Sequence, residues 1–204
     1  MSDKPGMRAA PRWLATAIAL AVGISCVVAL LALRARKPAA PGTPPPPADE
    51  LALCAAVEAH ADKYAQASVP GNGAALTALR EARRAAIARV DHADGTATAW
   101  FGTVDTLTTT DGGKLGVVIR LPCSDRVWIR TWGTAAADAQ HATLIDPSAP
   151  LHAKLAAMSN GNVVTFSGRF LIDPQDHWKQ TANAESEAMR EPQFLFRFAD
   201  ITKL

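Results

Sequence analysis

The chain has 204 residues, of which 49% are hydrophobic, and it carries 21 basic and 19 acidic residues. Six of the basic residues but only one acidic residue lie within residues 1–37, so the remaining chain holds 15 basic and 18 acidic residues. This balance lacks the basic excess expected of a protein that binds nucleic acid without sequence preference, and it disfavours that class while leaving room for a local basic groove.

Residues 13–33 form a stretch of twenty-one residues without a charge. As a helix with a rise of about 1.5 Å per residue, the stretch is roughly 31 Å long, which matches one crossing of a bilayer. It exceeds the ~7 to 15 residues of a signal-peptide core, and it is followed by Arg34, Arg36 and Lys37 instead of a small-residue cleavage site. We therefore predict a retained single-pass transmembrane helix after a short tail, residues 1–12.

The charges around this span do not decide its orientation. Lys4, Arg8 and Arg12 precede the span and three basic residues follow it, so the two sides tie in the positive-inside count. A short basic tail is a common cytoplasmic start for a bacterial signal anchor. We therefore predict an inner (cell) membrane protein whose C-terminal domain lies outside the cytoplasm.

A linker and a helical hairpin are expected next. Residues 34–48 are rich in proline and alanine, and because proline fixes φ and removes backbone donors, they predict a semi-rigid spacer. Within residues 49–90, two stretches with a helical period flank the turn VPGNG. The second helix, roughly residues 74–89, has an apolar face and an arginine face. The arginine face contains Arg80, Arg83, Arg84 and Arg89. The alternatives are a surface that contacts phosphates or lipid head groups and a solvated helix face, and we favour the solvated face.

From about Thr96 the hydrophobic period changes to two, and five strands are predicted. The turn TDGGK, rich in Asp and Gly, predicts a hairpin between the first two strands. A short helix that begins near Pro150 and ends at Asn160-Gly161 separates the third strand from the fourth. The segments in chain order are WFGTVDTLTT, LGVVIRL, RVWIRTW, the helix LHAKLAAM, NVVTFSGRF and QFLFRFADI.

This order of elements is that of the OB-fold, a five-stranded Greek-key barrel. The motif Trp100-x-Gly102-x-Val104 resembles the start of many OB domains, in which a glycine lets the first strand bend. The sequence GNVVTFSG at residues 161–168 resembles their fourth strand. Residues 96–204 thus resemble bacterial OB-fold proteins of the tRNA-anticodon-binding-like kind, including membrane-anchored members of unknown function. The predicted fold class is α+β, with one N-terminal transmembrane helix, a helical hairpin and a five-stranded OB-fold-like β-barrel.

The sequence contains no recognisable catalytic motif. It has no nucleophile motif, no glycine-rich phosphate loop after a strand and no HExxH. The polar clusters within residues 54–60 and 173–177 lack zinc-ligand spacing, and the glutamates within residues 185–191 are interpreted as a solvated approach to the last strand. We therefore expect a protein that is not an enzyme and that has no metal site and no cofactor.

Cys54 and Cys123 are the cysteines outside the predicted span. A bond between them in an oxidising compartment would close a loop of about 70 residues. Their relative position does not follow from the sequence, so the alternatives are a disulfide and two separate thiols. We predict two separate thiols.

Trp128, Arg130 and Trp132 in the third strand are the candidate ligand-binding residues. Alternation along a strand places all three on one face, with the aliphatic residues on the other. On the outer surface of the second and third strands, two indoles beside a guanidinium would lie where OB-folds bind oligonucleotides and oligosaccharides. The alternative is that the helical hairpin covers the tryptophans. We favour this alternative, because large exposed aromatic patches are uncommon without a partner.

The sequence therefore predicts a membrane-anchored, non-enzymatic binding or interaction module that faces the cell envelope. Its expected partners are the membrane, through residues 13–33, and a protein or a glycan. The alternative is a membrane-tethered OB domain that faces the cytoplasm and binds single-stranded nucleic acid, which is not the favoured partner.

Overall fold

The structure is a computed structural model that describes residues 45–90 and 94–204. The predicted tail and span, residues 1–33, lie outside the described residues, as does the linker up to residue 44. Within the part of the chain that is described, no helix is both long enough and apolar enough to cross a bilayer.

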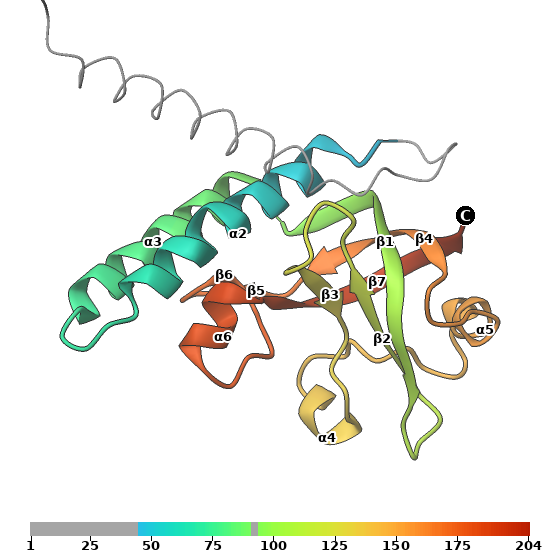
Figure 1. Ribbon diagram of the computed structural model, residues 1–204. Coiled ribbons are helices and arrows are strands. Elements are labelled where there is room, and N and C mark those ends of the chain that lie inside the picture. The colour runs from blue at the N-terminus through green and yellow to red at the C-terminus, as the bar shows by residue number, and fades with distance from the viewer. Residues whose placement is uncertain (1–44, 91–93) are drawn as a thin grey trace, which may run out of the picture. The chain divides into compact units, whose positions relative to one another are not determined.

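Five strands close into a β-barrel in the order β1-β2-β3-β7-β4 (Figure 1). Neighbouring strands are antiparallel except β3 and β7, which run parallel. The barrel confirms the predicted α+β fold of a hairpin followed by five strands, and it is consistent with an OB-like fold. The strands are β1 (Thr96–Thr109), β2 (Leu115–Arg120), β3 (Trp128–Arg130), β4 (Val163–Phe170) and β7 (Gln193–Lys203).

Strand β1 bends so that it serves two neighbours, pairing with β4 through its first half and with β2 through its second half. Its register shifts once along each neighbour, as expected where a strand turns a barrel corner. At Gly102 a Cβ atom would lie 2.1 Å from Cγ2 of Ile119 on β2. This close approach explains the glycine in the motif that resembles the start of OB domains.

Aromatic and aliphatic side chains fill the barrel. The predicted alternation of β2 is confirmed, because Val117, Ile119 and Leu121 are at most 1% exposed. Helix α5 (Pro150–Ala156), the predicted short helix, adds Leu155, which is fully buried, to the same core. The ring contacts of this core join Trp100, Phe166, Phe170, Trp178, Phe194 and Phe196.

Two helices and two strands beyond the predicted set occupy the two long connections. Between β3 and α5 lies α4 (Ala135–Asp138). The connection from β4 to β7 contains the two-stranded ribbon of β5 (Ile172–Asp173) and β6 (His177–Trp178), followed by α6 (Glu185–Arg190). The segment before the last strand, predicted to be solvated, therefore contains a helix. Glu185 in this helix accepts a hydrogen bond from Tyr64 at 3.2 Å.

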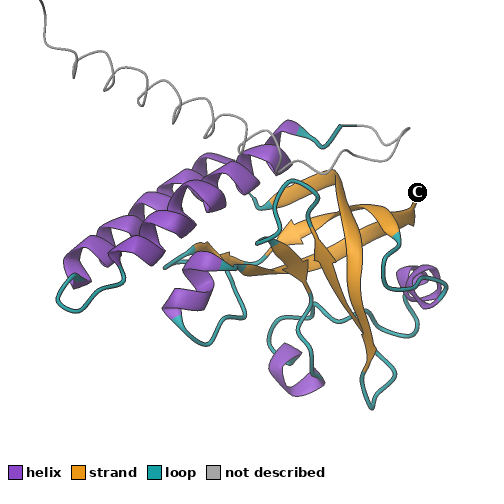
Figure 2. Cartoon of the chain, viewed as in Figure 1, coloured by secondary structure: helices purple, strands orange, loops and turns teal. Residues whose placement is uncertain are grey.

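Helices α2 (Ala48–Ala67) and α3 (Gly73–Val90) form the predicted hairpin and lie side by side next to the barrel (Figure 2). Helix α2 also packs on α6, and α3 contacts β6. Leu53, Val57 and Ile87 are fully buried and belong to the same core as the barrel side chains. The hairpin and the barrel therefore share one hydrophobic core.

The prediction that the arginine face of α3 is solvated is wrong for two of its residues. Arg83 is 1% exposed and donates a hydrogen bond to the carbonyl of Ala188 at 2.5 Å, and burial lowers its pKa to about 10. Arg80 pairs with Asp176 at 2.9 Å. The unforeseen connection between β4 and β7 covers this face, because it supplies the partners of both guanidinium groups.

Candidate functional site

The structure confirms the predicted alternation along the third strand. Trp128 and Arg130 are half-buried and lie on the outer surface of the barrel, whereas Val127 and Ile129 are fully buried in the core. Regular strand pairing is shorter than the predicted segment and ends at Arg130. The outward orientation of Trp128 and Arg130 therefore follows from the regular alternation of side chains along β3.

Two rows of side chains cross this outer surface. Arg120 on β2, Trp128 on β3 and Gln193 on β7 are paired in register, and Val118 is paired with Arg130 in the next row. Directly paired residues of neighbouring strands place their side chains about 5 Å apart on the same side of a sheet. We call these five residues the β2–β3 face. It brings an indole next to two guanidinium groups and a side-chain amide.

Hydrogen bonds orient both guanidinium groups of the β2–β3 face. Arg130 donates from Nη1 to Oε1 of Gln193 at 2.5 Å and from Nε to the carbonyl of Thr131 at 3.0 Å. Partial burial lowers the pKa of Arg130. Arg120 pairs with Asp125 at 2.8 Å. Arg120 therefore has an exposed acidic partner beside Trp128, whereas the hydrogen-bond partners given for Arg130 are uncharged.

Trp132 has a different environment from Trp128. Its ring stacks on His141 with centroids 5.8 Å apart and an interplanar angle of 25°. Its Nε1 atom is buried and has no hydrogen-bond partner among the described residues. The group that covers Trp132 thus comes from the connection between β3 and α5, whereas the expected cover was the helical hairpin.

A buried carboxylate shapes this connection. Asp138, 5% exposed, accepts hydrogen bonds from the backbone amides of Thr143 and Leu144 at 2.7 and 3.0 Å. The hydroxyl of Thr143 donates to the same carboxylate at 2.6 Å and accepts from the amide of Trp132 at 2.8 Å. The role of Asp138 could not be predicted from the sequence, because no local pattern marks an acidic residue whose hydrogen bonds come from the amides of a loop.

A surface cleft of about 410 Å³ lies between this connection, α5 and β7. Its lining includes the apolar side chains of Leu144 and Phe198, and also Lys154 and Asp200, which form an ion pair at 2.6 Å. In the described part of the chain, no group of three or more His, Cys, Asp or Glu side chains is placed to hold a metal ion.

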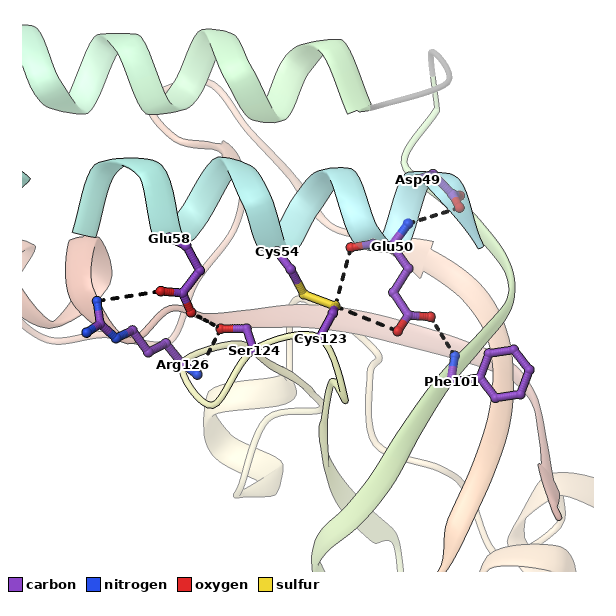
Figure 3. Close-up of a disulfide and its surroundings, with 8 residues drawn as sticks. All are labelled: Asp49, Glu50, Cys54, Glu58, Phe101, Cys123, Ser124 and Arg126. Carbon is purple, nitrogen blue, oxygen red and sulfur yellow. Dashed lines mark hydrogen bonds and ion pairs between the residues drawn. A yellow bond between two sulfur atoms is a disulfide. The ribbon is translucent and has the colours of Figure 1, made fainter. Parts of the chain in front are cut away.

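Cys54 and Cys123 form a disulfide, so the prediction of two separate thiols is wrong (Figure 3). Helix α2 packs on the loop between β2 and β3 and brings the two Cα atoms within 6.0 Å. On the same side, Glu58 accepts a hydrogen bond from Ser124, and Arg126 pairs with a second acid of α2, Asp62, at 2.7 Å. The loop that joins the strands of the β2–β3 face is therefore fastened covalently and by polar contacts to the hairpin.

Glu50 is fully buried beside this disulfide. Its Oε2 accepts a hydrogen bond from the amide of Phe101 at 2.7 Å, while the neighbouring Asp49 accepts one from Nε1 of Trp100 at 2.9 Å. Burial raises the pKa of Glu50 to about 8, the Phe101 amide lowers it, and the charge of Asp49 raises it. Burial thus favours the protonated form of Glu50. Because its pKa is raised from 4.5 to about 8 on folding, the stability that Glu50 contributes below about pH 4.5 is lost progressively as the pH rises to about 8.

No protein-family model matches this sequence, and no curated protein or solved structure shows significant similarity to it.

Proposed function

We propose that this protein is a membrane-anchored, non-enzymatic binding module of the cell envelope, and that its barrel is an OB-fold domain of the tRNA-anticodon-binding-like kind. The β2–β3 face recognises a protein or a glycan. The strand order with parallel β3 and β7 supports the OB assignment. The observation that carries the proposal is the outward row of Arg120, Trp128 and Gln193, which lies where OB-folds bind extended ligands.

The composition of the face favours a glycan as its ligand. Trp128 supplies a flat apolar surface, and Arg120, Arg130 and Gln193 supply polar groups around it. Binding sites of this kind combine an aromatic contact with a few oriented polar groups that fix specificity. A sugar chain offers both surfaces, because its rings carry apolar C–H faces and polar hydroxyl edges.

The disulfide supports a location outside the cytoplasm. Disulfides persist in oxidising compartments and are rare in the cytosol, where thiols are kept reduced. Cys54 and Cys123 are joined. The expected single span at residues 13–33 supplies the anchor in this proposal, and the alternative of a cytoplasmic binder of single-stranded nucleic acid loses support.

We expect Trp128→Ala to reduce ligand affinity without unfolding the protein. An aromatic ring stacked on a nucleic-acid base contributes about 1 to 3 kcal/mol, and we expect a loss of this size for a stacked sugar. The purified full chain would be titrated with soluble cell-wall glycan fragments and with a single-stranded oligonucleotide, following tryptophan fluorescence. Arg169→Ala is the matched control, because Arg169 is an exposed side chain of β4. Equal affinity of Trp128→Ala and the parent protein for the glycan would contradict the proposal, and saturable quenching by the oligonucleotide alone would favour the nucleic-acid alternative.

Membrane orientation gives a separate prediction. A reporter enzyme that is active only outside the cytoplasm should be active when it is fused after Leu204. The matching fusion to a reporter that works only in the cytoplasm should be inactive. The reverse pattern would rule out the envelope-facing arrangement.

A further inference from the structure

The carboxyl group of Glu50 faces the Cys54–Cys123 disulfide from the first turn of α2 (Figure 3). Its Oε1 atom lies 3.9 Å from Sγ of Cys123, and its main-chain oxygen lies 3.7 Å from the same sulfur. Glu50 and Cys54 are four residues apart on the helix, so they share one side of it. A titratable group with no role in the β2–β3 face therefore lies against the only disulfide of the described residues.

The two redox states of this disulfide offer Glu50 different partners. In the oxidised state the sulfur of Cys123 carries no hydrogen and donates nothing to the oxygens beside it. In the reduced state the Cys123 thiol is a hydrogen-bond donor, and the main-chain oxygen and the carboxyl Oε1 of Glu50 both lie close to it. A donor to a carboxylate stabilises its charged form, so reduction lowers the pKa of Glu50 relative to the oxidised state.

Among the described residues, no cation forms an ion pair with Glu50 that would keep it charged while the disulfide is intact. The groups that act on it are the carboxylate of Asp49 on α2 and the amide of Phe101 on β1. From the loop between β2 and β3 it meets Cys123, whereas Arg126 of that loop pairs with Asp62. Burial of Glu50 thus favours its protonated form in the oxidised protein.

We propose that Cys54, Cys123 and Glu50 form a proton-coupled thiol–disulfide site, in which reduction of the disulfide by an external dithiol discharges the proton of Glu50. Overall, the dithiol loses two electrons and two protons and closes to its own disulfide. The protein gains two thiols, Glu50 becomes a carboxylate, and one proton is released to water.

The exposure of the two cysteine residues sets the order of steps. Cys123 is half-buried and Cys54 is 3% exposed, so the incoming thiolate attacks Sγ of Cys123, and Cys54 leaves as a thiolate that takes a proton. The second thiolate of the reductant then attacks its own sulfur in the mixed disulfide. Cys123 leaves, and Glu50 is the acid placed beside it to supply the proton.

The test measures how the reduction equilibrium depends on pH. The purified full chain would be equilibrated with fixed ratios of reduced and oxidised dithiothreitol at several pH values from 6 to 8, quenched with acid, alkylated and weighed by mass spectrometry. Because the reduced protein binds one proton fewer at Glu50, its equilibrium constant for reduction should rise by up to about tenfold per pH unit. In Glu50→Gln, which keeps the shape but carries no proton, the constant should change less than twofold.

Glu58→Gln is the matched control, since Glu58 lies on the same helix and contacts the same loop through Ser124, and it should behave as the parent protein does. Infrared difference spectra of the parent protein supply a readout that needs no variant. The band of a protonated carboxyl should disappear on reduction. A parent equilibrium constant that does not change with pH, an equal dependence in Glu50→Gln, or a carboxyl band that survives reduction would overturn the proposal.

Discussion

Replacing Cys54 and Cys123 together with alanine is expected to lower the free energy of unfolding by about 4 kcal/mol, the chain-entropy value for a loop of about 70 residues. The disulfide joins residues 69 apart in the sequence and ties α2 to the loop between β2 and β3. Most domains are stable by only about 5–15 kcal/mol, so a loss of this size is a large share of the total. Urea denaturation of the full chain under non-reducing conditions measures it.

Two comparisons separate the cross-link from side-chain packing. Reduction of the parent protein keeps both cysteine side chains, so it should reproduce most of the loss if the cross-link is its cause. Ser124→Ala, next to Cys123, removes the hydrogen bond donated to Glu58 and the one accepted from the amide of Arg126, and it should cost about 2 kcal/mol. A double variant that unfolds at the same urea concentration as the parent protein would show that the disulfide does not hold the hairpin to the barrel.

The barrel could be predicted from the sequence because its strands carry their own pattern. From Leu115 in β2 to Leu121 directly after it, every second residue is a buried aliphatic one, and this is the alternation that the sequence displays. The outward positions of Trp128 and Arg130 follow from the same rule. Their neighbours Arg120 and Gln193 were not predictable, since they depend on the register of β3 with two other strands, one of which runs parallel to it.

The contacts between the hairpin and the barrel could not be predicted. Helix position and periodicity place the residues that make these contacts on solvent-exposed surfaces. Acidic residues suit a helix N-terminus in water, yet tertiary packing buries Glu50 completely. Arg83 belongs to the polar face of its helix, and only the segment around α6 supplies the carbonyl that binds it. Helix α6 is six residues long, which is too short to show a helical period in the sequence.

We expect Gly168→Ala to destabilise the protein by about 3 kcal/mol or more, because β4 and β7 leave no room for a side chain at this position. A Cβ atom on Gly168 would lie 2.1 Å from the carbonyl oxygen of Arg197 and 2.6 Å from a ring carbon of Phe196. The oxygen belongs to the backbone of β7, so it moves only if the two strands separate. Gly168 is paired with Phe198 at the point where the register of β4 and β7 shifts.

The matched control for this substitution is Gly112→Ala in the turn between β1 and β2, where a Cβ atom would meet nothing within 4 Å. Its effect should stay within about 0.5 kcal/mol. Thermal and urea unfolding of both variants, followed by circular dichroism, measure the difference. If Gly168→Ala unfolds at the same temperature and urea concentration as Gly112→Ala, then β4 and β7 do not approach each other closely at this point. The pairing of β4 with β7 at Gly168 would then be contradicted. A selective loss in Gly168→Ala would show that this glycine is required for the closure, since the two substitutions add the same methyl group.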